Sequence, residues 1–458
     1  MSSLYIGFDD TDSRQGMCTT YLAYKVVDFL LKRNARFLDY PLLIRLNPNI
    51  PWKTRGNGAV ALHVEVDNEE SIVEGVRTLV ENDSHIGHGA NPGLVFYSGE
   101  KVPDDIKEFA RGALHEVLSR KRAMEIAKEH DAEVYAFGNG QGVVGALSAI
   151  GTSLDEDHTF EIIAYRKQEN CGKLREISKE TVVEMAEQTY PKTYNNYDYK
   201  HKRVLITPHG PDPIFCGIRG EDSATLLQAF LRLDIPEELE GCMIFRTNHG
   251  TNAHLTHRFD LSQLKTYTSG YVDGVVDSEP YAIKGGHAFF TIKNDQGSAL
   301  CAVYEPTGLS QLAQKLSSGD LIEIGGGVRK ATSKHSKVIN VEYIRILKIA
   351  SKLEYVNPLC NKCGKRLKSD GKGKGYKCEV CGYREHSAQK VSVELAREMK
   401  EGLYVPVPKA HRHLTKPLQR YCMEKSSHDH VLNPHWYCKF ASDNLVLTDT
   451  KIKLVNSQ

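Results

Sequence analysis

The sequence predicts a multidomain α+β protein that ends in a small β-barrel and a metal-binding module, and three observations lead to this prediction. The chain has 458 residues, whereas a single hydrophobic core rarely extends beyond about 250–300 residues. Strand-like and helix-like segments alternate up to about residue 266, and short strands follow one another after it. Four cysteines near the C-terminus are spaced as two CxxC pairs. We therefore expect five segments, at residues 1–128, 129–266, 267–350, 351–390 and 391–458.

The composition indicates a globular protein of a reducing compartment. Hydrophobic residues make up 40% of the chain, and the formal net charge of +1 favours neither an acidic nor a basic partner for the chain as a whole. The N-terminus has no basic segment followed by an apolar one, so no secretory signal is predicted, and no apolar run reaches the roughly 18 residues of a membrane span. Seven of the eleven cysteines stand singly, which is typical of reduced thiols. We expect a cytoplasmic location, no membrane contact and no obligate protein partner.

The first segment begins with a pattern that favours phosphate binding. Leu4–Phe8 is a short apolar run, predicted as a buried strand that ends at the acidic stretch FDDTDS. Apolar residues at helical spacing follow from 22 to 30, and Thr19 or Thr20 is placed to cap this helix. The order is a strand, a loop and then the beginning of a helix. This is the arrangement in which the N-terminus of the helix binds phosphates. Further strands are predicted at 59–66 and 94–98, and further helices at 67–82 and 106–130.

The second segment is predicted as a mixed α+β domain of about 130 residues, a usual domain size. Two of its loops have unusual polar density, GIRGED (217–222) and RTNHGTNAH (246–254). An arginine beside two acids is usually a surface ion pair, so these loops are either functional or merely solvated. In the functional case, Arg219, Glu221 and His249 are the candidate substrate-binding residues. Strands are predicted at 143–150, 159–165, 204–207 and 242–247, and helices at 182–188 and 224–233.

The third segment changes to five short strands, the signature of an OB-fold, a small barrel that binds single-stranded nucleic acid. A helix-like stretch at 309–316 lies between the third strand and the fourth. The strands are predicted at 271–277, 286–293, 299–304, 321–326 and 338–347.

The region after the barrel is strongly basic. Residues 351–420 contain 16 lysines and arginines against 7 aspartates and glutamates. The stretch HRHLTKPLQR (411–420) is either a solvated linker or a strip that contacts the phosphate backbone of a nucleic acid. In the second case the flanking aromatic residues are placed to stack on bases: Tyr404, Tyr421, His435 and Trp436.

The cluster of Asp9, Asp10 and Asp12 predicts a magnesium site. Carboxylates this close repel one another unless a cation joins them, and Mg²⁺ is usually held by one or two carboxylates together with substrate phosphates. The alternative is a solvated acidic turn that caps the next helix. Lys53 and Arg55, in a basic loop, are candidates to contact the same phosphates. The sequence contains no GxxxxGK[ST] motif, which excludes a P-loop kinase or ATPase.

The cysteines Cys360, Cys363, Cys378 and Cys381 predict a structural zinc ion. They form the motifs CNKC and CEVC, with fourteen residues between the two pairs. Four thiolates complete a tetrahedral shell and leave no open position for water, so the ion is expected to be structural rather than catalytic. The alternative, two CxxC pairs that occur by chance, is weaker at this spacing.

In their order along the chain, these motifs resemble those of the archaeal tRNA-isoleucine 2-agmatinylcytidine synthetases. The matching stretches extend over nearly the whole chain: GFDDTDS, GMCTT, RLNPNIPWKTRGNGAV, GIRGE, TNH, GGH, YEP, the four-cysteine ribbon and RHLTKPL. The resemblance implies a kinase-like α/β N-terminal domain, a ferredoxin-like domain, an OB-fold and a zinc ribbon.

The resemblance also implies an activity. It predicts an enzyme that uses ATP to attach agmatine to C2 of the wobble cytidine of an isoleucine tRNA with a CAU anticodon, so that the anticodon reads AUA. A phosphoryl group from ATP would activate the C2 carbonyl oxygen before the agmatine amine displaces it. It further implies that Thr19 becomes phosphorylated and that Asp9, Asp10 and Asp12 hold the metal and phosphates, and Glu221 is our nominee for the guanidinium of agmatine. The competing hypothesis is a nucleic-acid-binding protein in which an OB-fold and a zinc ribbon accompany a metal-dependent phosphohydrolase domain.

Overall fold

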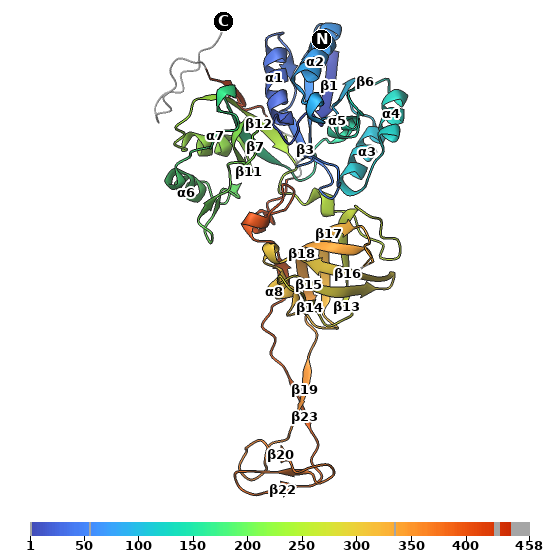
Figure 1. Ribbon diagram of the computed structural model, residues 1–458, viewed down its shortest axis with the longest axis vertical. Coiled ribbons are helices and arrows are strands. Elements are labelled where there is room, and N and C mark those ends of the chain that lie inside the picture. The colour runs from blue at the N-terminus through green and yellow to red at the C-terminus, as the bar shows by residue number, and fades with distance from the viewer. Residues whose placement is uncertain (1, 55, 334–335, 426–430, 441–458) are drawn as a thin grey trace.

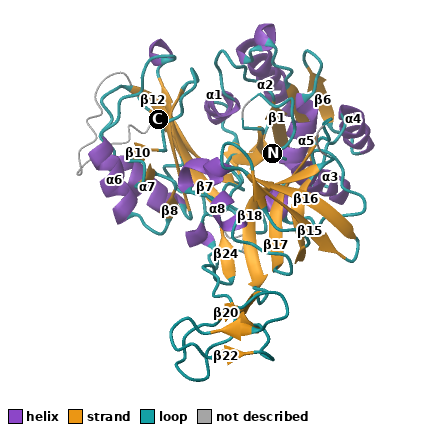
Figure 2. Ribbon diagram, turned by 60° about the horizontal axis from the view of Figure 1, so that its bottom comes forward, coloured by secondary structure: helices purple, strands orange, loops and turns teal. Residues whose placement is uncertain are grey.

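The structure is a computed structural model in which residues 2–54, 56–333, 336–425 and 431–440 are described. Helices and a large sheet form one end of an elongated molecule, which we call the sheet body (Figure 1). A barrel follows it, and a small ribbon on a two-stranded stalk forms the other end. Figure 2 shows the barrel between the sheet body and the ribbon from a second direction. Arg55, a predicted phosphate contact, lies outside the described residues.

The first half of the sheet body alternates strands and helices. Leu4, Ile6 and Phe8 of its first strand point into the core that the first helix covers. Gly7 faces the opposite way, where an added Cβ atom would lie 2.2 Å from the carbonyl oxygen of Ala146. The elements are β1 (Ser2–Asp9), α1 (Thr19–Leu31), β2 (Arg36–Phe37), β3 (Leu42–Arg45), β4 (Gly58–Val66), α2 (Glu69–Asp83), β5 (Gly93–Ser98), α3 (Asp104–His115), α4 (Arg120–Glu129), β6 (Glu133–Ala136) and α5 (Gly142–Gly151).

The second half continues the same sheet. Its elements are β7 (Thr159–Arg166), α6 (Lys179–Gln188), β8 (Thr193–Tyr194), β9 (Tyr197–Asp198), β10 (Arg203–Val204), β11 (Ile214–Gly220), α7 (Ser223–Leu231), β12 (Leu239–Thr247) and β25 (Tyr437–Lys439). Among the described residues the strand order is β6-β5-β1-β4-β3-β12-β7-β11-β8, with β2 paired to β4 and β25 paired to β12. The parallel pairing of β3 with β12 joins the two halves, and this seam is where the candidate site lies.

Four predictions in this region are wrong. The stretch GIRGED is not a loop, because its first four residues belong to β11, and the strand expected at 204–207 is limited to β10. The expected strand at 143–150 is the helix α5, and the expected helix at 106–130 is interrupted between α3 and α4. Nearly every residue of α5 is buried, so its sequence lacks the polar face that identifies a helix. Because α5 packs on β1 and β6 pairs with β5, residues 133–151 lie with the first half. This packing favours a domain boundary after Gly151 rather than at 128, and the boundary stays a prediction.

The barrel contains the five strands that the sequence predicts. It is closed because β13 pairs with both β17 and β15, while β16 pairs in parallel with β18. The predicted helix at 309–316 is shorter in the structure. The elements are β13 (Ser269–Val276), β14 (Tyr281–Ala282), β15 (Ala288–Asn294), β16 (Gly297–Val303), α8 (Ser310–Ala313), β17 (Leu321–Arg329), β18 (Val338–Lys348) and β24 (Gly402–Tyr404).

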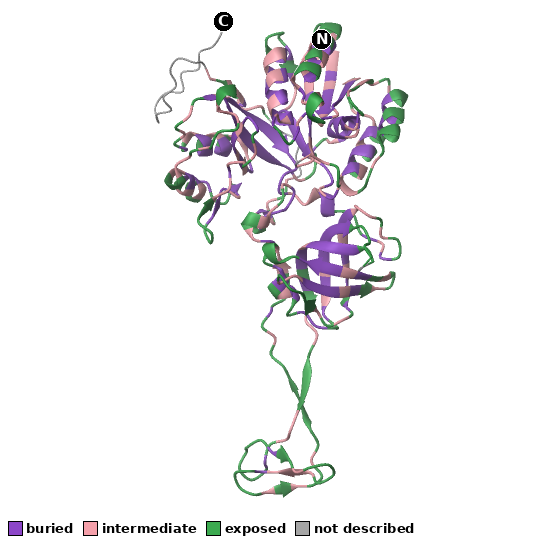
Figure 3. Cartoon of the chain, in the orientation of Figure 1, coloured by how far each residue is buried: buried purple, intermediate pink, exposed green. Residues whose placement is uncertain are grey.

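The ribbon is held away from the barrel by two antiparallel strands, β19 (Leu353–Val356) and β23 (Val391–Glu394). Its own strands are β20 (Lys368–Ser369), β21 (Tyr376–Lys377) and β22 (Arg384–Glu385). Figure 3 shows that the stalk is almost entirely exposed, whereas the sheet body and the barrel have buried cores.

The chain then returns from the ribbon to the sheet body. β24 pairs with β18 of the barrel, and β25 pairs with β12 of the sheet. Within the part of the chain that is described, no helix is long and apolar enough to cross a membrane.

Candidate active site

A cavity of about 410 Å³ lies at the seam between the two halves of the sheet body. One wall is formed by the end of β1, the start of α1 and the loop after β3. The other wall is formed by Arg45 at the end of β3, by β7 and by β11, and the C-terminal segment adds one residue. We call the first the acidic wall and the second the basic wall. The residues that the argument uses are Asp9, Asp10, Asp12, Thr19, Arg45, Lys53, Glu161, Arg219 and His413.

The three aspartates lie together on one wall, as the sequence predicts. The Asn91 N–H donates to Asp10 Oδ2 at 3.2 Å, and the backbone of Asp10 is left-handed with φ 57°. A Cβ atom at Gly145 of α5 would lie 1.8 Å from Asp9 Oδ2, so only glycine leaves room for this carboxylate. Burial, and then the proximity of Asp10, raises the pKa of Asp9 well above its usual range, and burial raises the pKa of Asp10 to about 6. Carboxylates that resist ionisation in this way are stabilised by a bound cation.

The three aspartates fit a Mg²⁺ ion that is only partly coordinated by the protein. Among the described residues, the one group of three or more potential ligands that converges on a single point is the cysteine cluster of the ribbon. The aspartates do not converge to form a complete protein cage. Mg²⁺ commonly takes only one or two protein carboxylates and completes its shell with phosphates and water. The wall therefore fits an ion that is shared with a bound triphosphate.

Thr19 and Thr20 open α1 and both line the cavity. The predicted cap is wrong, because the N-cap residue is Cys18 and no side chain caps the helix. Thr11 Oγ1 donates to Thr19 Oγ1 at 3.1 Å, and Thr19 is buried. The Thr19 hydroxyl is therefore held beside the acidic cluster. Lys53 also lines the cavity, with Nζ bonded to the Pro48 carbonyl oxygen, and burial lowers its pKa.

The opposite wall contains a buried charged network that the sequence only partly indicates. Arg219 Nε donates to Glu161 Oε1 at 3.0 Å, and Arg219 Nη2 donates to His413 Nδ1 at 2.9 Å. Arg45 Nε donates to His249 Nε2 at 2.6 Å, and His249 Nδ1 lies 3.0 Å from Glu161 Oε2. Since arginine only donates, Nε2 of His249 must be the acceptor, and its proton lies on Nδ1, the nitrogen beside Glu161.

Burial has opposite effects on the two groups at the centre of this network. It lowers the pKa of His249 to about 3, so the imidazole is neutral. Burial alone would raise the pKa of Glu161, but the N–H of the neutral His249 and the charge of Arg219 outweigh it and hold that pKa well below its usual range. Arg219 and His249 were predicted, whereas Arg45, Glu161 and His413 were not. The signal for Glu161 was available, because it is an acidic residue inside the apolar strand 159–165.

Glu221 does not line the cavity. Its carboxylate accepts from Arg420 Nε at 2.5 Å and lies 2.9 Å from Lys425 Nζ. Arg420 is fully buried and also pairs with Asp157 at 2.8 Å. The guanidinium-binding role predicted for Glu221 therefore has no support in this geometry, because protein cations already occupy the carboxylate.

The C-terminal strip 411–420 is only partly exposed, with Arg412 and Leu418 open to solvent. Lys416 is buried against Asp157, and Arg420 is buried as described above. The strip packs between the sheet body and the barrel and brings His413 into the cavity. Of the predicted base-stacking residues, Trp436 is only 9% exposed and packs on Phe37 with ring centroids 4.9 Å apart, so it belongs to the core.

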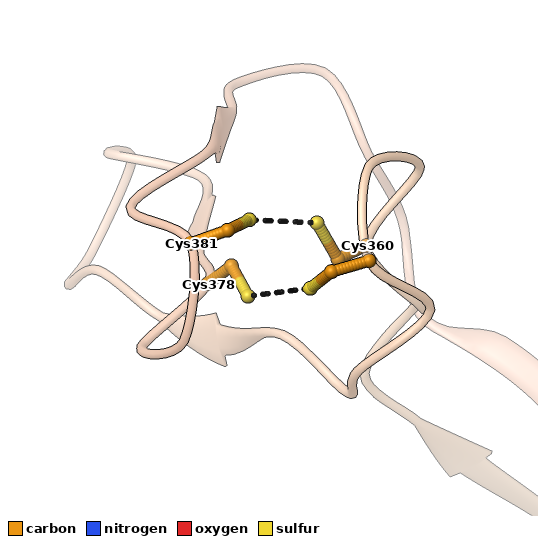
Figure 4. A group of neighbouring side chains, drawn as sticks. Cys360, Cys378 and Cys381 are labelled. Carbon is orange, nitrogen blue, oxygen red and sulfur yellow. Dashed lines mark hydrogen bonds between the residues drawn. The ribbon is translucent and has the colours of Figure 1, made fainter.

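The four cysteines of the ribbon converge as predicted (Figure 4). Cys360 and Cys381 Sγ atoms are 3.5 Å apart, and Cys363 and Cys378 Sγ atoms are 3.4 Å apart. A tetrahedral ion with bonds of about 2.3 Å would separate its sulfur ligands by about 3.8 Å, so the donor set fits zinc closely. The N–H of Cys381 lowers the pKa of the Cys378 thiol to about 6, which favours the thiolate that a metal requires.

Three family models match the chain. They are described as the TiaS TCKD domain at residues 5–67, the TiaS FLD domain at residues 140–254 and the TiaS C-terminal zinc ribbon domain at residues 357–399.

Known proteins match over almost the full length. TiaS of Cenarchaeum symbiosum (strain A), an isoleucine-tRNA 2-agmatinylcytidine synthetase, is 43% identical, over 91% of this chain and 92% of the relative. A structure of TiaS in complex with its isoleucine tRNA and ATP has a TM-score of 0.81 and 37% identity, covering 92% of this chain and 98% of its own. A structure of TiaS with the same tRNA, AMPCPP and agmatine has a TM-score of 0.79 and 36% identity, with the same coverage.

Proposed function

The chain belongs to the TiaS family of isoleucine-tRNA 2-agmatinylcytidine synthetases, and we infer that it uses ATP to join agmatine to the wobble cytidine of the isoleucine tRNA with a CAU anticodon. The observation that carries this conclusion is the cavity at the seam. It brings the acidic cluster and Thr19 together with Arg45 of the first half and Arg219 of the second half. An enzyme of this kind must hold a triphosphate, a base and an amine in one space, and this cavity offers both an acidic and a basic wall.

The reaction that fits this cavity has two steps. In the first, a bond forms between the C2 carbonyl oxygen of the cytidine and a phosphorus atom of ATP, while that phosphorus loses its bond to the leaving phosphate. In the second, the primary amine of agmatine attacks C2 and loses a proton, and the oxygen leaves with the phosphorus. The first step is needed because a ring carbonyl oxygen is a poor leaving group. Catalysis is then mostly positioning and charge neutralisation.

The residues of the acidic wall have separate tasks in this proposal. Asp9, Asp10 and Asp12 would hold Mg²⁺, which neutralises the charge of the phosphates when it is bound. Lys53 is placed to approach the same phosphates once it leaves the Pro48 carbonyl.

Thr19 is proposed as the acceptor of a phosphoryl group from ATP in an event separate from the two steps above. Its hydroxyl lies beside these carboxylates at the start of α1. Incubation with ATP and Mg²⁺ should add one phosphate to Thr19, detected by mass spectrometry. The phosphate should be absent in Asp12→Ala and when Mg²⁺ is chelated. A fully active enzyme with unmodified Thr19 would refute the acceptor role while leaving the synthetase activity intact.

The domains divide the remaining work. We propose that the first half of the sheet body is a kinase-like domain and the second half a ferredoxin-like domain. The two family models there support this division, except that the second model starts at residue 140 and so includes α5. The barrel's strand connectivity, with β17 between β13 and β18, supports an OB-fold. With the zinc ribbon it would hold the tRNA while the wobble base leaves its stack to enter the cavity. A cytoplasmic location belongs to the proposal, because ATP and tRNA are found there.

The direct test is product formation. A transcript of the isoleucine tRNA with a CAU anticodon, incubated with the enzyme, ATP and agmatine, should gain the mass of agmatine less one water at the wobble cytidine. Omission of ATP or agmatine should leave it unchanged. ATP hydrolysis that requires neither tRNA nor agmatine, with no modified cytidine, would favour the phosphohydrolase alternative.

A further inference from the structure

The two arginines of the basic wall are held in the same manner. Each uses its Nε–H inside the wall, Arg45 toward His249 at 2.6 Å and Arg219 toward Glu161 at 3.0 Å. His249 is fully buried, does not line the cavity and connects the two arginines through Glu161. One imidazole and one carboxylate therefore fix the orientation of both guanidinium groups.

The other donors of these arginines are unused among the described residues. Both arginines line the cavity, and no described residue accepts a hydrogen bond from either Nη atom of Arg45 or from Nη1 of Arg219. Guanidinium groups with unused, partly buried donors bind oxyanions well, because their fork of N–H groups matches phosphate oxygens. The aspartates, which would hold the metal and the triphosphate, line the same cavity.

We propose that His249 is a positioning residue that acts through Arg45, so that Arg45 and Arg219 are aimed at the oxygens of the phosphoryl group that is transferred to the cytidine. The inference rests on the proposed function, and it replaces the direct substrate contact expected of His249. Guanidinium groups that are already oriented stabilise the negative charge of the phosphoryl group in the transition state, because they do not need to reorganise during the reaction.

A neutral imidazole is the group that this position requires. It accepts from Arg45 on one nitrogen and presents an N–H beside Glu161 on the other, which neither an ammonium nor a carboxylate can do. A protonated ring would add a third positive charge between two guanidinium groups. Burial prevents this, since it lowers the pKa of His249 to about 3.

The test is a double-mutant cycle on kcat for agmatine transfer to the isoleucine tRNA. Arg45→Ala should lower kcat by about 10³-fold, as for loss of an arginine in phosphoryl transfer, and His249→Leu by about 10²-fold, with KM for agmatine and tRNA nearly unchanged. The double variant should be slower than Arg45→Ala by much less than the effect of His249→Leu alone, because without Arg45 the imidazole can act only on Arg219, through Glu161. His249→Gln keeps one acceptor and one donor and should retain most of kcat.

His254→Leu is the matched control. His254 is equally buried and also pairs with a carboxylate, Glu342 at 3.0 Å, but it does not line the cavity or contact Arg45. In the double variant, the loss of kcat caused by His254→Leu should multiply with the loss caused by Arg45→Ala. If His249→Leu does not fold, as judged by circular dichroism, His249→Phe carries the same test.

The proposal would be overturned if the kcat losses of His249→Leu and Arg45→Ala multiplied in the double variant. A His249→Leu defect confined to KM would also overturn it. A wild-type enzyme that forms no modified cytidine would instead refute the proposed function.

Discussion

The walls of the cavity and the zinc ribbon differ in how their side chains are held. In the sheet body, Glu161, His249 and Arg420 are at most 4% exposed, and each has a charged or hydrogen-bonding partner. On the stalk and ribbon, even apolar side chains are open, with Tyr355 64% and Val380 69% exposed (Figure 3). The buried cluster of the ribbon is only Cys360, Leu367 and Cys378, two of which are zinc ligands, so the fold of the ribbon depends on its metal. Under the proposed function, in which the ribbon helps to hold the tRNA, chemistry and tRNA binding can therefore be damaged separately.

The largest expected effect lies in the cavity. Asp12→Ala should lower turnover by about 10³-fold or more, because it removes a carboxylate that we propose as a ligand of the Mg²⁺ shared with the phosphates, while tRNA affinity stays nearly unchanged. Steady-state kinetics and filter binding measure the two. Asp104→Ala is the control, since Asp104 is an exposed acid at the start of α3. Equal loss of tRNA affinity in Asp12→Ala would show that the cluster supports the fold instead.

The next effect concerns stability of the sheet body. Arg420→Leu should lower the free energy of unfolding by about 3–5 kcal/mol, because it leaves Asp157 and Glu221 buried with fewer partners. Arg258→Leu breaks an exposed pair with Asp273 and should leave the free energy of unfolding nearly unchanged. Urea unfolding compares the two variants. A similar small loss in both would mean that Arg420 does not anchor the C-terminal segment.

A substitution in the ribbon should instead weaken tRNA binding while the stability of the sheet body stays unchanged. Cys378→Ser should abolish zinc binding and weaken tRNA binding by about tenfold or more, since the basic ribbon loses its fold. The thermal transition of the sheet body should stay in place. Cys422→Ser, at an exposed single cysteine, should keep one zinc per chain by elemental analysis. If zinc-free protein bound tRNA with unchanged affinity, the folded ribbon would not be needed for tRNA binding.

The smallest effect is at the contact between the sheet body and the barrel. Burial opposes ionisation of Glu342, but His254 and Arg412 outweigh it and lower its pKa to about 2. A depressed folded pKa gives stability that is present above about pH 4.5 and is lost as the pH falls toward 2. Glu342→Gln should therefore flatten the fall of Tm between about pH 4.5 and 3. A parallel fall in both proteins would contradict the assigned pKa.

The sequence reveals the parts of this molecule that have local signatures. The cysteine spacing, the barrel strands and the acidic end of β1 were predictable because each depends on neighbouring residues. The helix α5 was missed because burial on nearly all sides removes its polar face.

The basic wall was largely hidden for a different reason. Arg45, Glu161 and His413 are distant in sequence and meet only through the pairing of β3 with β12 and the return of the C-terminal strip. Glu221 looked like a ligand-binding acid because the sequence does not show Arg420, a distant residue near the C-terminus, as its partner.

The central claim is that the cytidine carbonyl oxygen leaves on phosphorus. An isoleucine tRNA carrying ¹⁸O at C2 of its wobble cytidine, incubated with enzyme, ATP and agmatine, tests this directly by mass spectrometry of the products. The mechanism predicts one ¹⁸O atom in the phosphate-containing product for each agmatine joined. Modified tRNA formed with the label released as water, and unlabelled phosphate, would contradict phosphoryl activation in this cavity.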